Sequence, residues 1–242
     1  MPPAPSVLST TLLAGGAVAL ALIGLAAAGP LQDGEAALQR DDYATALQIF
    51  RPLAEQGNAD AQFNLGSMYE QGQGVPEDDE QAAAWYRKAA DQGSADAQFH
   101  LGGMYRGGRG VPQDYAEAAA WLRKAADQGS ADAQLYLGGM YQEGQGVPQD
   151  YAQAAAWYLK AADHSSADAR LDAEVNLGGM YASGQGVPQD YAQAYMWFDL
   201  AAANADWARA KRDDLAGKMT PEGIAEGQRL AREWMQGHPS TR

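Results

Sequence analysis

The stretch ADAQFHLGGMYRGGRGVPQDYAEAAAWLRKAADQG, residues 95–129, decides the fold, because close copies of it fill most of the chain. Its Met-Tyr pair recurs at intervals of 36, 36 and 40 residues, beginning at Met68, Met104, Met140 and Met180. The prolines of its Gly-Val-Pro segment keep the same intervals, at Pro76, Pro112, Pro148 and Pro188. Self-similarity at a period of about 20–50 residues is typical of solenoids, in which one small unit is stacked many times.

The first half of the unit predicts an amphipathic helix. Ser94 is a favourable N-cap, and Asp96 lies in the first turn, where the helix dipole favours a negative charge. Ala97, Leu101 and Tyr105 follow at i, i+4 and i+8, which is the spacing of a buried helical stripe. Glycines recur at one phase of this helix in every repeat, and we expect them to allow close approach of a second helix.

The second half predicts another helix after a Gly-rich corner. Asp114 with Glu117 three residues later is a capping-box pattern, Trp121 lies on the core stripe, and Gly129 is a typical C′ residue. A phosphate-binding loop would need a Lys and a hydroxyl where this turn has Val-Pro. A tight corner between helices is therefore favoured over a ligand loop. The extra four residues of the last repeat lie in ADARLDAEVNLGGMY, residues 167–181, and predict one more helical turn.

The repeats predict a division of the chain. We expect a signal peptide or membrane anchor over 1–29, a divergent N-terminal capping repeat over 30–57, and four repeats over 58–93, 94–129, 130–165 and 166–203. Capping helices over 204–236 and a tail over 237–242 complete the chain. The segment Leu12–Gly29 is apolar and small residues precede a cleavage site after Ala28, but a basic n-region is missing. Cleavage after export, a retained anchor and an unused leader all remain open.

This repeat resembles the Sel-1-like repeat, an α/α solenoid related to tetratricopeptide repeats, over about residues 31–236. The resemblance implies an all-α, right-handed superhelix that acts as an adaptor for proteins or peptides. Many bacterial members are exported, and some serve host interaction or envelope processes. A cysteine-rich branch is linked to β-lactam binding or hydrolysis, but this chain has no cysteine, so that activity is not carried over.

Composition and residue spacing predict a binding protein and not an enzyme. The net charge of −14 argues against sequence-independent nucleic-acid binding, and the missing cysteines exclude thiolate chemistry and disulfides. None of the three histidines has zinc-site spacing, so we expect no metal, no cofactor and no catalytic residue. An envelope-acting hydrolase and a cytosolic regulatory scaffold remain the alternatives. We expect a periplasmic or extracellular monomer whose folded part does not contact a membrane.

Specificity should lie where the repeats differ, on the concave face that the resemblance assigns to the first helices. We hypothesise that Asn64, His100, Tyr136 and Asn176 form a polar ladder for an extended peptide, because amides bond backbone groups and Tyr adds rigid contact area. Neighbouring candidates at the same helices are Asp60, Gln71, Asp96, Arg106, Asp132 and Glu143. The alternative is that these are ordinary solvated helix residues. The acidic composition favours a basic or neutral partner segment.

Overall fold

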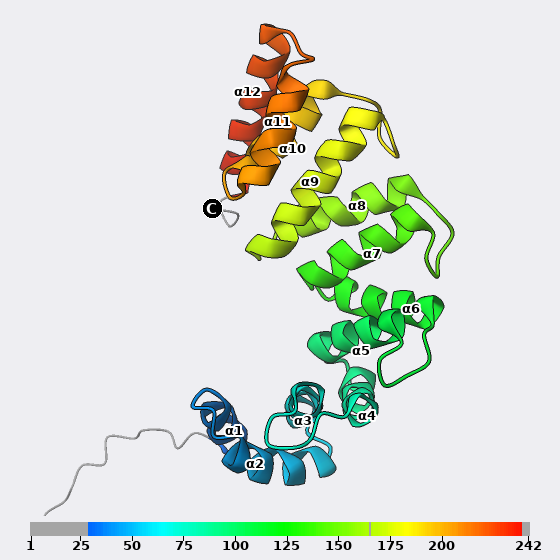
Figure 1. The fold of residues 1–242 in the computed structure, drawn as a ribbon, viewed down its shortest axis with the longest axis vertical. Coiled ribbons are helices and arrows are strands. Elements are labelled where there is room, and N and C mark those ends of the chain that lie inside the picture. The colour runs from blue at the N-terminus through cyan, green and yellow to red at the C-terminus, as the bar shows by residue number, and fades with distance from the viewer. Residues whose placement is uncertain (1–28, 165, 239–242) are drawn as a thin grey trace, which may run out of the picture.

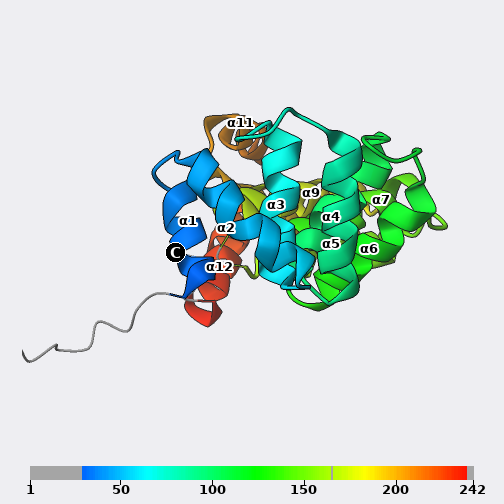
Figure 2. The same cartoon turned by 90° about the horizontal axis from the view of Figure 1, so that it is seen from below.

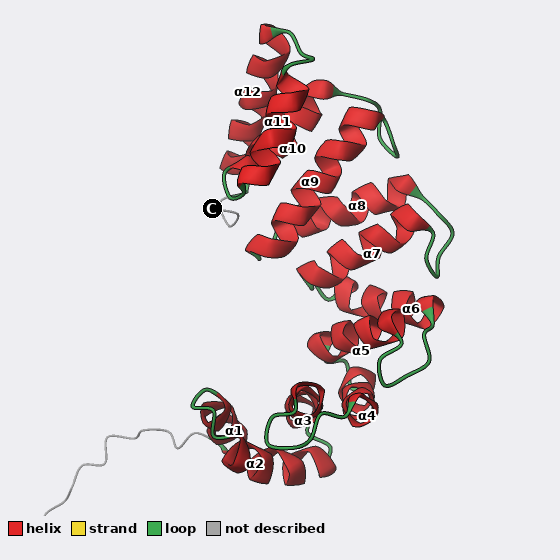
Figure 3. Cartoon of the chain, viewed as in Figure 1, coloured by secondary structure: helices red, strands yellow, loops and turns green. Residues whose placement is uncertain are grey.

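The structure is a computed structural model that describes residues 29–164 and 166–238. Within these ranges it contains twelve α-helices and no strand, which confirms the predicted all-α class (Figure 3). The helices are α1 (Pro30–Leu38), α2 (Tyr43–Glu55), α3 (Ala59–Gln71), α4 (Asp79–Asp91), α5 (Ala95–Gly107), α6 (Tyr115–Asp127), α7 (Ala131–Glu143), α8 (Tyr151–Ala162), α9 (Ala167–Ser183), α10 (Tyr191–Ala202), α11 (Asp206–Ala216) and α12 (Pro221–Gly237).

The helices form a solenoid in which each one packs mainly against its neighbours in the chain. Within a repeat the first helix packs on the second, as α5 does on α6, and the second helix packs on the first helix of the next repeat. The stack bends into an arc, with α1 and α2 at one end and α12 at the other (Figure 1). Both ends lie on the same side of the molecule after a 90° turn as well, so the arc is open on that side (Figure 2).

The N-caps at Asp114 and Ser94 are formed, whereas the expected capping box and a side-chain cap at Ser166 are not. The Asp114 carboxylate accepts from the backbone N–H of Ala116 at 2.9 Å and of Glu117 at 3.0 Å. The Asp114 N–H, which a capping box would give to the Glu117 side chain, is instead donated to the Tyr105 carbonyl at 2.9 Å. This bond closes the corner, because it ties the start of α6 to the end of α5. Ser94 caps α5 as predicted, whereas the Ser166 hydroxyl makes no capping bond to α9.

The repeated glycines have two different roles. A Cβ at Gly102 would lie 2.8 Å from Cγ of Leu122, and one at Gly138 would lie 2.7 Å from Cε1 of Tyr158. The predicted close helix–helix approach is therefore confirmed at this first position. The second position differs: a Cβ at Gly103 would meet no described atom within 4 Å. That glycine leaves open space on the surface of α5 and does not serve packing.

The Gly-rich segment is a corner that also joins successive repeats. Gly108 ends α5 in the left-handed conformation, with φ of 68°. Gly110 also has a positive φ, 63°, and a Cβ there would lie only 2.0 Å from the carbonyl oxygen of Asp79, at the start of the preceding repeat's second helix. The corner thus rests directly on backbone of the previous repeat, and only glycine allows this approach.

The four-residue insertion lengthens a helix, as predicted. α9 has 17 residues where α7 has 13, and both end at a left-handed glycine, Gly184 and Gly144. Two further helices, α11 and α12, follow the last repeat, and the Thr220 hydroxyl caps α12 by accepting from the N–H of Gly223.

The described residues include no helix that is long and apolar enough to span a bilayer. Residues 1–28 hold almost all of the predicted signal peptide or anchor, and they lie outside the described residues, as do 239–242 of the predicted tail.

Candidate functional site

Helices α5 and α7 carry the predicted variable residues into two cavities on the surface that the first helices of the repeats form. The larger, here called the His100 pocket, has a volume of about 370 Å³. Its walls combine charged groups with aromatic and apolar ones, and its floor includes the open position at Gly103. The lining residues are Glu70, Phe99, His100, Gly103, Arg106, Gly107, Arg109, Leu122 and Tyr136.

A partly buried carboxylate, that of Glu70, organises one end of the His100 pocket. Glu70 Oε2 accepts from the Tyr86 hydroxyl at 2.7 Å and lies 3.3 Å from Nδ1 of His100. Its other oxygen, Oε1, accepts from the guanidinium of Arg109. The bonds from His100, Tyr86 and Arg109 lower the pKa of Glu70 to about 2, although burial acts in the opposite direction. Glu70 is therefore ionised at neutral pH and fixes the positions of the three side chains around it.

His100 is held by aromatic rings as well as by Glu70. Its ring stacks on Tyr86 with centroids 5.0 Å apart, and the rings of Phe63 and Phe99 approach it edge-on at 5.5 and 5.6 Å. Such aromatic pairs are favourable beyond their buried area. The imidazole is thus a rigid part of the pocket wall, half-buried between repeats.

Arg106 and Tyr136 form the wall between the two cavities. The guanidinium carbon of Arg106 lies 4.2 Å from the centroid of the Tyr136 ring, within the range of a cation–π interaction. The Tyr136 ring also contacts Phe99 at a centroid distance of 5.6 Å. These contacts join the end of α5 to the middle of α7.

The second cavity, here called the Asn176 pocket, shares Arg106 and Tyr136 with the first and has a volume of about 240 Å³. It lies between α7 and α9 and is the more polar of the two. Its remaining lining residues are Leu135, Gly139, Met140, Glu143, Gln145, Tyr158, Asp172 and Asn176. Of the ten predicted partner-binding residues, His100, Arg106, Tyr136, Glu143 and Asn176 come together in these two adjoining pockets.

The other predicted residues lie apart from the pockets. Asn64 donates its amide to the Asp60 carbonyl of its own helix at 3.0 Å, and Gln71 donates to the Ser67 hydroxyl at 2.8 Å. Asp96 and Asp132 are exposed in the first turns of their helices. Asn64, the N-terminal member of the predicted ladder, is thus bonded within α3 and lines neither pocket.

The predicted site residues do not include Arg109, Phe99 and Asp172, and the sequence marks Glu70 only as a position that varies between repeats. Arg109 occupies the variable position of the Gly-x-Gly turn, where the other repeats have Gln, and this difference was the available signal. Its guanidinium reaches Glu70 across 39 positions of sequence. The acidic composition suggested an acidic binding surface, but the surface around the His100 pocket is not uniformly acidic. Guanidinium groups outnumber carboxylates around the His100 pocket, because most acidic residues lie elsewhere on the surface.

Groups of three or more His, Cys, Asp or Glu side chains placed to hold a metal ion do not occur in residues 29–164 and 166–238.

Comparisons with known proteins agree with the repeat fold. The family model described as Sel1 repeat matches residues 19–58, 59–94, 95–130, 131–166 and 171–206. A solved structure of c5321, a protective antigen of uropathogenic Escherichia coli with an SLR fold, is similar at a TM-score of 0.76 and 33% identity, covering 88% of this chain. The chain spans about half of that protein, 46% of its length.

A Sel1 repeat protein from Oxalobacter formigenes is similar at a TM-score of 0.71 and 34% identity, covering 76% of this chain and 74% of that one. No curated protein matches the chain. Sel1 repeat proteins generally mediate protein–protein interactions, and their solenoid is typically a scaffold without enzymatic activity. With five matched repeats that form a continuous α/α solenoid, the chain belongs to the Sel1 repeat family.

Proposed function

We propose that the chain is a non-enzymatic adaptor that holds a segment of a partner protein across the His100 and Asn176 pockets. The single observation that carries this is that the two cavities adjoin: they share Arg106 and Tyr136, and both are lined in part by residues that differ between repeats. A uniform frame with local differences at adjoining cavities is what selective recognition on a repeat protein requires.

The face that bears the pockets suits this role. It belongs to the first helices, which the family resemblance places on the concave side. In Figure 1, α5 and α9 lie nearer to the open side of the arc than α6 and α8 do. An extended segment lying along this side would cross α5, α7 and α9 in turn and reach both pockets without changing direction.

The lining residues indicate the chemistry of the bound segment. Arg106 and Arg109 favour a carboxylate or a backbone carbonyl in the His100 pocket, and Phe99 and Leu122 favour an adjacent apolar group. Glu143 and Asp172 favour a basic or amide side chain in the Asn176 pocket. We therefore expect a segment with an acidic and apolar portion followed by a basic or amide residue.

Two observations support binding without catalysis. The family's solenoid is typically a scaffold without enzymatic activity, and the ionisable group at one end of the His100 pocket is already bonded to other side chains. Glu70 is bonded to three side chains, and its pKa of about 2 lies far from the value that a general acid or base needs at neutral pH. We further propose that the protein works after export, in the periplasm or outside the cell. The apolar segment 12–29 and the small residues before Pro30 support this.

A substitution at one glycine position tests the binding proposal with a matched control. Gly103 and Gly179 occupy equivalent positions in two repeats, and a Cβ at either would meet no described atom within 4 Å. Gly103 lines the His100 pocket, whereas Gly179 lines neither pocket. Peptides selected from a random library against the parent chain should bind Gly103→Leu at least about tenfold more weakly and Gly179→Leu unchanged.

Equal loss in both variants would mean that the peptides bind elsewhere, and unchanged binding by both would remove the pockets from the proposal. Circular dichroism of both variants controls for folding.

For localisation, N-terminal sequencing of the protein recovered from fractionated cells should find a new N-terminus near residue 29 in the exported fraction. An intact N-terminus in the cytosolic fraction would contradict export.

A further inference from the structure

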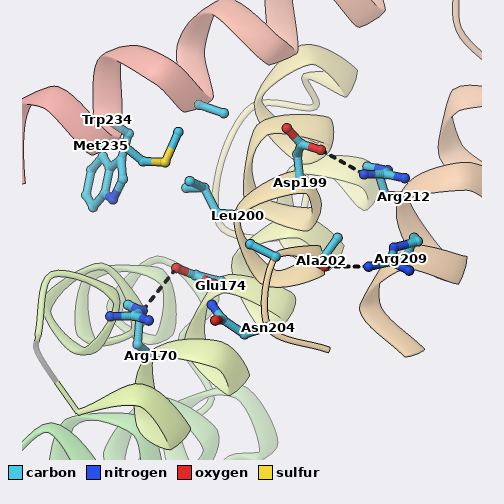
Figure 4. A pocket seen from close by; sticks show the side chains of 12 residues that line it. Arg170, Glu174, Asp199, Leu200, Ala202, Asn204, Arg209, Arg212, Trp234 and Met235 are labelled. Carbon is cyan, nitrogen blue, oxygen red and sulfur yellow. Dashed lines mark hydrogen bonds and ion pairs between the residues drawn. The ribbon is translucent and has the colours of Figure 1, made fainter. Parts of the chain in front are cut away.

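A third cavity lies at the C-terminal end of the solenoid, outside the proposed partner site. It has a volume of about 500 Å³, within the usual range for small-molecule sites, and is lined by residues of α9, α10, α11 and α12 and of the segment between α10 and α11. Figure 4 shows Arg170 and Glu174 of α9 below Trp234 and Met235 of α12, with two arginines of α11 to the side. We call it the C-terminal cavity.

The inserted turn of α9 creates its charged end. In the other repeats one buried glutamine occupies this place, as Gln98 does: it donates to the Ala90 carbonyl at 3.1 Å and accepts from Gln128 at 2.7 Å. In α9 the extra four residues put two side chains there. Arg170 matches the glutamine when residues are counted from the helix start, and Glu174 matches it when they are counted from the core leucine. A pair of opposite charges thus replaces a neutral amide.

This pair is incompletely satisfied. The side chains of Arg170 and Glu174 are only 9% and 5% exposed, and Nε of Arg170 lies 3.6 Å from Oε1 of Glu174. Oε2 of Glu174 is buried and has no hydrogen-bond partner in the described part of the chain. Burial raises the pKa of Glu174 to about 7, against the opposing effect of Arg170. A buried acceptor left open is costly. Gln62 and Gln98 have a donor for this oxygen, whereas Oε1 of Gln134, in the neighbouring repeat, is also buried without one among the described residues. In α9 the open acceptor is instead a carboxylate beside a buried guanidinium, and burying two charges is more costly than burying an amide, so packing alone does not account for the pair.

The rest of the cavity offers a cationic and an apolar surface. Arg212 is held by Asp199 at 3.0 Å, whereas Arg209 is half-exposed and contacts Asp206 at 3.0 Å on its solvent side. Leu200 lies between these arginines and the Arg170–Glu174 pair, and Trp234 and Met235 supply further apolar surface above the pair in the view of Figure 4. The cavity therefore contains a buried open acceptor, guanidinium groups and an apolar wall.

We propose that the C-terminal cavity binds a small zwitterion of the α-amino-acid type with an apolar side chain. Its ammonium group donates to the open oxygen of Glu174, its carboxylate accepts from Arg170, and its side chain lies against Trp234 and Met235. Two opposite protein charges 3.6 Å apart complement a ligand whose own charges are separated by one carbon atom.

The test uses the intact chain and calorimetric titration with L-leucine, L-methionine and L-phenylalanine. Two analogues of leucine, 4-methylpentanoate without the ammonium group and 3-methylbutylamine without the carboxylate, are the ligand controls. We expect at least one amino acid to bind with a Kd below about 1 mM, and each analogue at least about tenfold more weakly. Equal binding of either analogue would overturn the zwitterion assignment, and no binding of any amino acid would overturn the site.

Variants locate the binding. The double variant Arg170→Gln, Glu174→Gln restores the amide chemistry of the other repeats and should lose at least about tenfold in affinity. Ala203 is exposed at the cavity and Ala203→Trp should block entry without altering the core. This second variant keeps the test decisive if the double variant does not fold. Gly179→Leu, at a position that lines none of the three cavities, should bind like the parent. Unchanged affinity in a folded double variant, or in Ala203→Trp, would overturn the proposal.

Discussion

The guanidinium carbon of Arg106 lies 4.2 Å from the centroid of the Tyr136 ring, and this contact between α5 and α7 forms the wall that the two pockets share. Neither residue is part of the repeated core, since both occupy positions that change from repeat to repeat. The pair therefore belongs to the variable surface of the solenoid and not to the helical core that all repeats share.

Gly102→Ala and Gly103→Ala should change stability in opposite directions. At Gly102 the new methyl group would lie 2.8 Å from Leu122, so we expect a loss of about 1–3 kcal/mol in the free energy of unfolding. At Gly103 the methyl group meets open space, and the higher helix propensity of alanine should stabilise by up to about 1 kcal/mol. Urea denaturation of the two variants measures both changes, and a similar loss in both would contradict the two roles.

Gly110→Ala should be more damaging than Gly107→Ala. Gly110 has a φ of 63°, and a Cβ there would lie 2.0 Å from the Asp79 carbonyl oxygen, so the corner must move away from the preceding repeat. We expect a loss of at least about 2 kcal/mol. Gly107 is in the last turn of α5, where a Cβ would approach only Cγ of Arg109, at 3.6 Å. Thermal melts followed by circular dichroism should show a lower Tm for Gly110→Ala alone.

Glu174 should make the protein less stable as pH rises toward neutrality. Its pKa is about 7 in the folded chain and 4.5 ordinarily, so the folded state holds a proton that the unfolded state has lost. The stabilisation is full below pH 4.5 and disappears as pH rises to about 7, by an amount on the order of 3 kcal/mol. Urea titrations between pH 4.5 and 7.5 should show this decline in the parent and a flatter profile in Glu174→Gln. Parallel profiles would contradict it.

Glu70 should act in the opposite direction and in a lower pH window. Bonds from His100, Tyr86 and Arg109 lower its pKa from 4.5 to about 2, so the folded state releases a proton that the unfolded state binds. This stabilisation is present above pH 4.5 and is lost as pH falls toward 2. Glu70→Gln should therefore be less stable than the parent at pH 6, and the difference should shrink on acidification. A constant difference from pH 6 to 2.5 would rule out the coupling.

The helical frame could be predicted from the sequence because its causes are local. A cap such as Asp114, a stripe such as Ala97, Leu101 and Tyr105, and a terminating glycine act within one or two helical turns, and the 36-residue period repeats them. The capping box failed for a non-local reason: the Tyr105 carbonyl, brought close by the corner, takes the N–H of Asp114. In the same way, only the packed structure distinguishes Gly102, against Leu122, from the unopposed Gly103.

By itself the sequence determined the repeat, its two helices, the longer α9 and the surface on which the repeats differ. Only the tertiary structure decided which of those differences meet. Glu70 contacts residues 30 and 39 positions away, in His100 and Arg109, and α9, α10, α11 and α12 together line a cavity at the Arg170–Glu174 pair. Such contacts depend on how successive helices are rotated and stacked against one another. Many small packing interactions along the whole solenoid set this stacking, so the spacing of residues within one repeat does not encode the contacts.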